Sequence, residues 1–190
     1  MKILFLILGI ISFLYLLIVF LSAPSSKKHA DLEKIKGKYI AHRGLHSETI
    51  PENSLGAFQA AVEKNYPIEI DLHLTKDGKV VVFHDRTLKR MCGNDGSIVD
   101  MTLDELKKFR LLDSEECIPT LEECLNIVQG KTPLLIEFKM ENGNTNALCT
   151  KADKILANYN GTYLVFGGTG GYWMDHFRVH AVDEAIAVQT

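Results

Sequence analysis

The chain has 190 residues, with 21 basic and 24 acidic side chains and a formal net charge of only −3. This mild acidity provides no electrostatic footprint for nucleic acid, so we expect no nucleic-acid partner. The four cysteines show no C-x-x-C spacing, which argues against a zinc site or a disulfide framework.

The N-terminal segment is the least ordinary part of the composition. Ile3–Leu21 contains no charged residue and matches the roughly 20 apolar residues that a helix needs to cross a bilayer. A cleaved signal peptide is the alternative, because Lys2 gives a positive start, although Pro24 should hinder cleavage. We therefore expect a single-pass transmembrane anchor over residues 1–23 and a membrane location. Lysines on both sides of the apolar run leave the side of the membrane open.

A polar linker is expected over residues 24–37, and one domain over residues 38–190. Two capping boxes, at Thr102 and at Thr120, each predict the start of a helix. We expect strands near Tyr39, Ile68, Val80, Leu134 and Leu164, and helices over Ser54–Lys64, from Thr102, over Thr120–Gly130 and over Asn146–Tyr159. Strands that alternate with helical crossovers predict an α/β fold with a parallel sheet.

Ile68–Leu74 is the most informative of these strands, because it alternates apolar and polar residues. Glu69 and Asp71 are two positions apart, so both carboxylates point to the same side. Two like charges on a buried face repel each other unless a cation lies between them, and hard divalent cations favour carboxylate oxygens. An exposed acidic strand face is the alternative for this stretch alone.

The β-branched run Val80–Phe83 is typical of a strand buried in a parallel sheet, and His84 follows it directly. His42 and Arg43 follow the strand near Tyr39, and Glu137 and Lys139 share one face of the strand near Leu134. In a β/α barrel the carboxyl ends of the strands converge on the catalytic face. We therefore expect these residues to meet in one site, with His73 lining its mouth.

The chemistry of this set suits cleavage of a phosphodiester. His42 and His84 can act as general acid and base, since an unperturbed imidazole titrates near neutral pH. Arg43 and Lys139 can pair with phosphate oxygens. Three carboxylates can hold one divalent cation and leave positions open to substrate: Glu69, Asp71 and Glu137.

Seven motifs resemble those of the glycerophosphodiester phosphodiesterase family and occur in the family's order, between about Tyr39 and Met140. They are His42-Arg43-Gly44, Pro51-Glu52-Asn53-Ser54, Glu69-Ile70-Asp71, Thr75-Lys76-Asp77-Gly78, His84-Asp85, Ile118-Pro119-Thr120-Leu121 and Ile136-Glu137-Phe138-Lys139.

The resemblance implies a TIM-type (β/α)8 barrel that hydrolyses glycerophosphodiesters to an alcohol and glycerol 3-phosphate, through a cyclic phosphate. It implies Mg²⁺ or Ca²⁺ on the three carboxylates, with His84 as base, His42 as acid, and phosphate held by Arg43 and Lys139. Glu52, Asn53 and Asp85 are expected around this site, as loop-shaping residues or as contacts to metal or substrate. A phospholipase D-like activity on lysophospholipids is the related alternative.

The chain departs from the family pattern in its length. Only five strands are expected where a barrel needs eight, and the chain from Lys38 onward is shorter than the roughly 250 residues of a full barrel. We expect the barrel to be incomplete at its C-terminus and atypical after residue 166. A catalytically silent fragment is therefore a second alternative.

Overall fold

The computed structural model describes residues 2–21, 34–141, 143–166 and 187–188. Two compact units are present, Met1–Ala30 and Asp31–Thr190. The first holds helix α1 (Lys2–Leu21). When only the residues whose side chains the structure describes are counted, no helix is long and apolar enough to cross a membrane. Most of the expected linker, and the expected atypical tail apart from residues 187–188, lie outside the described residues.

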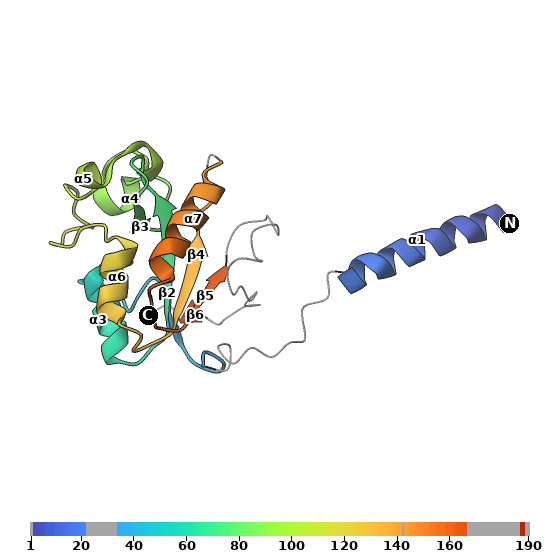
Figure 1. The fold of residues 1–190 in the computed structure, drawn as a ribbon, viewed down its shortest axis with the longest axis horizontal. Helices are drawn as coiled ribbons and strands as arrows, with labels where there is room; N and C mark the ends of the chain where they lie inside the picture. Colours follow the sequence, from blue (N-terminus) through green and yellow to red (C-terminus); the bar gives the residue numbers. More distant parts are fainter. Residues whose placement is uncertain (1, 22–33, 142, 167–186, 189–190) are drawn as a thin grey trace. The chain divides into compact units, whose positions relative to one another are not determined.

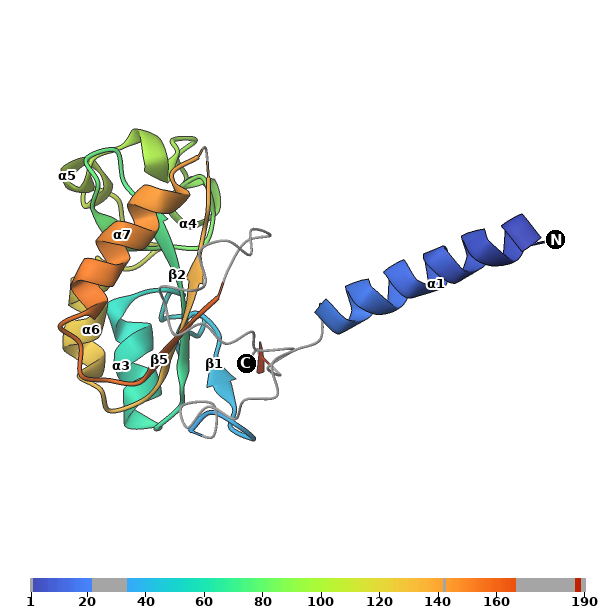
Figure 2. The ribbon, with the colours of Figure 1, turned by 45° about the vertical axis from the view of Figure 1, so that its right-hand side comes forward.

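The second unit is an α/β domain built on a largely parallel sheet (Figures 1 and 2). Its strands follow the order β5-β4-β2-β1-β6, with β3 attached to β2. They span Ile40–Ala41 (β1), Ile68–Leu74 (β2), Val80–Val82 (β3), Leu134–Phe138 (β4), Tyr163–Phe166 (β5) and Ala187–Val188 (β6). All neighbours on the main path pair in parallel, which confirms the predicted α/β fold with a parallel sheet.

The longer helices are α3 (Leu55–Glu63), α6 (Leu121–Val128) and α7 (Thr145–Leu156). Short helical turns follow β3: α4 (Lys89–Cys92), a 3₁₀ turn (Ile98–Asp100) and α5 (Leu103–Leu106). Ser54 caps α3 by accepting from the Ala57 N–H, as its side chain predicts. Both predicted capping boxes are present, at Thr102 and Thr120. Residues 89–92 and 98–100 are helical, although the sequence analysis expected no helix there.

Strand β3 forms at the predicted residues, but it does not pair in parallel as the sequence predicted. It pairs antiparallel with β2, with Val82 opposite Leu72 and Val80 opposite Leu74. The reason is the length of the connection, because Thr75–Lys79 is too short for the crossover of a dozen residues that parallel pairing needs. Strand β6, which the sequence did not predict, pairs in parallel with β1.

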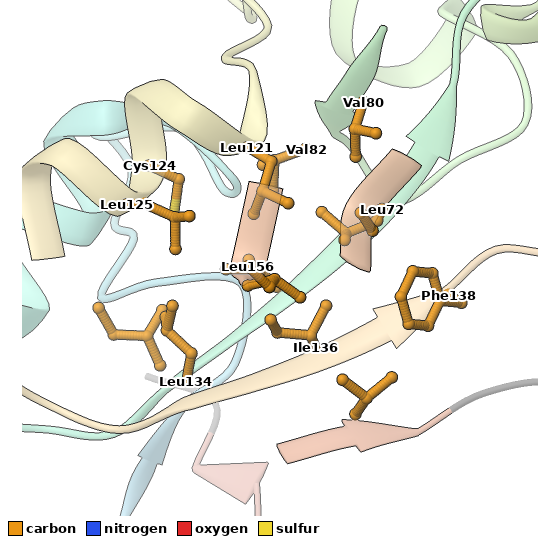
Figure 3. Packing of buried hydrophobic residues seen from close by; sticks show 14 of the residues in the cluster. Leu72, Val80, Val82, Leu121, Cys124, Leu125, Leu134, Ile136, Phe138 and Leu156 are labelled. Atoms are coloured by element: carbon orange, nitrogen blue, oxygen red, sulfur yellow. The ribbon is translucent and has the colours of Figure 1, made fainter. Parts of the chain in front are cut away.

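The main core lies between the sheet and helices α3, α6 and α7 (Figure 3). Ile70 and Leu72 of β2 and Ile136 of β4 belong to this cluster, packed with residues such as Leu121 of α6. The residues that alternate with them along β2 and β4 point to the other face of the sheet. A small second core covers the excursion between β3 and α6, and it includes Phe83 and Ile118.

Candidate active site

The polar residues of the strands gather on the sheet face that the helices do not cover. Glu69 is the register partner of Leu135, and Leu135 is the partner of Leu164. Leu135 and Leu164 form an apolar cluster with Ile40 of β1. This cluster is the floor of the site. Glu69 lies beside it, and Asp71 and Glu137 lie further towards the carboxyl ends of the strands.

Three carboxylates meet above this floor. Asp71 of β2 is paired in register with Glu137 of β4, and Glu69 lies two residues before Asp71. One oxygen from each of the three carboxylates lies within 4.8 Å of the others. The side chains of Glu69 and Asp71 are 6% and 1% exposed. The sequence prediction that these three side chains point to one place is therefore correct in its geometry.

Burial, followed by the charges of Asp71 and Glu137, raises the pKa of Glu69 to about 8. A hydrogen bond from the Arg43 N–H (3.0 Å to Oε2) and the charge of Lys139 oppose this rise. A group of acids this crowded favours a bound cation. The donor set is all oxygen, as Mg²⁺ and Ca²⁺ require, and in the described residues the buried Asn53 Oδ1 has no hydrogen-bond partner. The residues therefore fit a hard divalent cation.

Both cationic side chains lie against the carboxylates. Lys139 Nζ is 2.9 Å from Asp71 Oδ1 and 2.7 Å from Glu137 Oε1. Burial alone would lower the pKa of Lys139, but the hydrogen bond to Glu137 and the charge of Asp71 raise it. Arg43 Nη1 donates to Glu52 Oε1 (3.0 Å), and Arg43 Nε lies 3.6 Å from Asp71 Oδ2. The expected phosphate ligands are thus ion-paired within the site.

The loop after β1 carries an unusual backbone. Arg43 and Asn53 both have positive φ, at 57° and 51°. Asparagine tolerates this region, whereas arginine seldom adopts it. The conformation directs the Arg43 N–H at Glu69, and the Arg43 carbonyl accepts from the Asn53 N–H at 2.8 Å. Asn53 Nδ2 donates to Asp71 Oδ2 at 2.9 Å, so the loop is bonded directly to the acidic cluster.

The two histidines approach the cluster from different strands. His42 directly follows β1 and lies close enough to Asp71 and His84 for their charges to act on its ring. Burial, then the charge of Arg43, lowers the pKa of His42, while Asp71 acts in the opposite direction. His84 is about one-third exposed, and its Nδ1–H donates to Asp85 Oδ1 at 2.7 Å.

His84 follows an antiparallel strand, and not a strand of the parallel sheet as the sequence predicted. β3 runs back along β2, and the N–H of Phe83 donates to the Asp71 carbonyl at 2.9 Å. The hairpin therefore returns the chain to the level of Asp71, so His84 arrives there although its strand is antiparallel. His73 does not line the mouth: it is fully buried, and its Nε2–H donates to the His84 carbonyl at 3.2 Å.

Arg90 is a residue that the sequence did not indicate. Its guanidinium donates to Glu52 at 2.6 and 2.9 Å and to Asp85 at 2.8 and 2.9 Å. Glu52 and Asp85 are therefore both bound to the guanidinium of Arg90, although neither contacts the acidic cluster in the described structure. The only signal in the sequence was a basic residue shortly after His84-Asp85, on a stretch where no helix was expected.

Comparison with known proteins decides the family. The model of the glycerophosphoryl diester phosphodiesterase family matches residues 42–175, well over half of the chain. The chain belongs to this family. Over 116 residues it is 39% identical to a glycerophosphodiester phosphodiesterase of Caldanaerobacter subterraneus, covering 57% of this chain and 47% of that protein. Over 165 residues it is 31% identical to the human lysophospholipase D GDPD1, covering 80% and 51% of the two chains.

Solved structures of the family share the fold. A phosphodiesterase of Oleispira antarctica, in complex with the product sn-glycerol-3-phosphate, superposes with a TM-score of 0.64 at 29% identity. The match covers 68% of this chain and 57% of that one. The chain spans about half the length of the curated relatives that it matches.

Proposed function

We propose that this chain carries the active site of a metal-dependent phosphodiesterase that hydrolyses glycerophosphodiesters to an alcohol and glycerol 3-phosphate. The observation that supports it best is the cluster of Glu69, Asp71 and Glu137, whose carboxylate oxygens lie within 4.8 Å of one another. Membership of the family and the product held by the Oleispira antarctica enzyme favour the same activity. The strands, in this proposal, belong to a TIM-type barrel.

Glu69, Asp71 and Glu137 would hold one Mg²⁺ or Ca²⁺. When bound, the ion supplies positive charge that neutralises the phosphate oxygens during displacement. Lys139 Nζ now lies between Asp71 and Glu137, where it neutralises them. Lys139 and Arg43 would supply the positive charge that binds the phosphate oxygens of the substrate.

His84 acts as base and His42 as acid in the first displacement. Asp85 fixes the Nδ1–H of His84, which leaves its Nε2 to take the proton from a glycerol hydroxyl. That hydroxyl attacks phosphorus, and His42 protonates the departing alcohol oxygen. The lowered pKa of His42 makes its imidazolium a stronger proton donor, and it also reduces the fraction of His42 that carries the proton at neutral pH. The resulting cyclic phosphate is then opened by water with the two roles exchanged, giving glycerol 3-phosphate.

The test is release of glycerol 3-phosphate from glycerophosphocholine, with and without EDTA. We expect release that EDTA abolishes, and that is lost in the double variant Glu69→Ala and Asp71→Ala. Glu63→Gln is the matched control, because Glu63 is an exposed carboxylate of α3 that bonds only to Gln59 in the described structure. Release that persists in EDTA or in the double variant contradicts the metal-dependent mechanism.

A lysophospholipid substrate is the second candidate, favoured by the match to human lysophospholipase D over 80% of this chain. Hydrolysis of lysophosphatidylcholine would release choline and leave the acyl chain on the phosphate-bearing product. Product analysis with both substrates separates the two. A catalytically silent chain is the third reading, and cooperative thermal unfolding with stabilisation by Mg²⁺ or Ca²⁺ would argue against it.

We also propose that Ile3–Leu21 holds the protein at a membrane. The support is the sequence, which has no charged residue in this run. Sedimentation of the full chain with membranes that resists alkaline carbonate is the expected result. Extraction by carbonate contradicts it.

A further inference from the structure

Arg90 is the centre of an ion-pair network at the rim of the site. Its Nη1 and Nη2 donate to the two oxygens of Glu52, at 2.9 and 2.6 Å. Its Nε and Nη2 donate to the two oxygens of Asp85, at 2.8 and 2.9 Å. One planar guanidinium therefore binds two carboxylates in the paired geometry that arginine makes and lysine cannot.

One arm of this network leads to His84. The Asp85 carboxylate accepts from Arg90 on both oxygens and from His84 Nδ1 at 2.7 Å. The bonds from Arg90, ahead of the bond from His84, hold the pKa of Asp85 at about 2. Asp85 is thus kept ionised and fixed in place, so it accepts the Nδ1–H of His84 and leaves Nε2 unprotonated in the neutral ring.

The other arm leads towards the acidic cluster. Glu52 accepts from both Arg90 and Arg43, and Arg43 Nε lies 3.6 Å from Asp71 Oδ2. Arg90 itself stands on the short helix α4, which packs through Met91 into the second core. It therefore ties the loop after β1 and the loop after β3 to a packed element.

We propose that Arg90 is a positioning residue for His84, acting through Asp85, and for Arg43, acting through Glu52. This inference rests on the proposed phosphodiesterase function, because it assigns roles within that reaction. Arg90 makes no contact with the carboxylates of the acidic cluster in the described structure. Besides Glu52 and Asp85 its guanidinium contacts Met91 Sδ at 3.1 Å, which belongs to the second core, so its effect on the site is transmitted through the two carboxylates.

The experiment compares Arg90→Ala and Arg90→Lys with Lys89→Ala. Lys89 is the matched control, since it is the adjacent basic residue, is largely exposed and pairs at 3.0 Å with Asp95, away from the site. Arg90→Ala should lower kcat roughly 10- to 100-fold, the scale for groups that orient catalytic side chains. Arg90→Lys should retain a kcat between those of Arg90→Ala and the parent chain, because lysine cannot donate two hydrogen bonds to each carboxylate. Lys89→Ala should leave kcat unchanged.

Double variants show which arm transmits the effect. In an Asp85→Asn background, Arg90→Ala should cost much less kcat than in the parent chain, because the path to His84 is already broken. In a Glu52→Gln background, Arg90→Ala should raise KM less than in the parent chain. The reason is that Arg43, which binds substrate phosphate, has already lost its link to Arg90. The proposal is overturned if Arg90→Ala lowers kcat in the Asp85→Asn background, and raises KM in the Glu52→Gln background, by the same factors as in the parent chain.

Nitrogen-15 NMR of the His84 ring gives a readout that does not depend on turnover. The parent chain should hold the proton of neutral His84 on Nδ1, and Arg90→Ala should shift it towards Nε2, with no such shift in Lys89→Ala. An unchanged tautomer in Arg90→Ala overturns the proposal. If Arg90→Ala does not fold, as judged by urea unfolding, Arg90→Gln takes its place. Should the parent chain release no glycerol 3-phosphate, the proposed function fails, while the tautomer still decides whether Arg90 positions His84.

Discussion

Replacing Glu69 by glutamine should change how the stability of the metal-free protein depends on pH. Glu69 is 6% exposed, and burial beside Asp71 and Glu137 raises its pKa from the usual 4.5 to about 8. Between these two pH values the folded chain holds a proton on Glu69 that the unfolded chain has released. The stabilisation that this proton gives the folded chain is therefore complete below pH 4.5, and it is lost as pH rises to about 8.

The size of the effect follows from the same two values. One pH unit corresponds to about 1.4 kcal/mol, so the change from 4.5 to about 8 amounts to at most about 5 kcal/mol in the free energy of unfolding. The glutamine side chain of the variant carries no charge, and its amide oxygen can still accept the Arg43 N–H. At pH 9 in EDTA, Glu69→Gln should therefore be more stable than the parent chain by several kcal/mol, whereas at pH 4.5 the two should nearly coincide.

Urea unfolding in EDTA from pH 4.5 to pH 9 measures this difference, with Glu63→Gln as the control at an exposed carboxylate. Adding Mg²⁺ or Ca²⁺ should flatten the curve of the parent chain, because a bound cation keeps all three carboxylates ionised. Parallel pH curves for the parent chain and Glu69→Gln would refute the argument, since Glu69 would then titrate alike in the folded and unfolded chains.

Three further changes test the scaffold and the site. Gly44→Ala should cost more stability than Gly93→Ala in urea unfolding. Both positions have positive φ (80° and 67°), but a Cβ at Gly44 would lie 2.7 Å from that of Ala57, while Gly93 faces open space; equal losses would contradict this reading of the loop. Ile136→Ala should cost about 2–5 kcal/mol, because this side chain is fully buried, and a loss below about 1 kcal/mol would show that the core is loosely packed. Lys139→Met should weaken substrate binding, seen as a higher KM, and an unchanged KM would remove Lys139 from phosphate binding.

Much of the scaffold could be predicted because its signals are local. The alternation of β2 placed Glu69 and Asp71 on one side, and the capping boxes located the starts of α5 and α6. The direction of β3 is also encoded, in the short connection after β2, but the apolar run Val80–Phe83 is equally typical of a buried parallel strand. The burial of His73 depends on the β2–β3 hairpin, which brings the His84 carbonyl to its ring.

The rest of the site depends on tertiary structure. Arg90 and Glu52 are 38 residues apart, and no periodicity relates them. The ion pairs of Lys139 depend on the parallel register that sets Asp71 beside Glu137, and a strand pattern alone does not specify register. The positive φ of Arg43 is likewise imposed by its bonds to Glu69 and Asn53, because arginine has no local preference for that conformation.

Calorimetric titration of Mg²⁺ and of Ca²⁺ into the EDTA-treated, dialysed full chain tests the central claim most directly. The account predicts one binding site for at least one of the two ions, with affinity lost in Asp71→Asn and kept in Glu63→Gln. Binding that survives Asp71→Asn, or no binding of either ion to the parent chain, would contradict it.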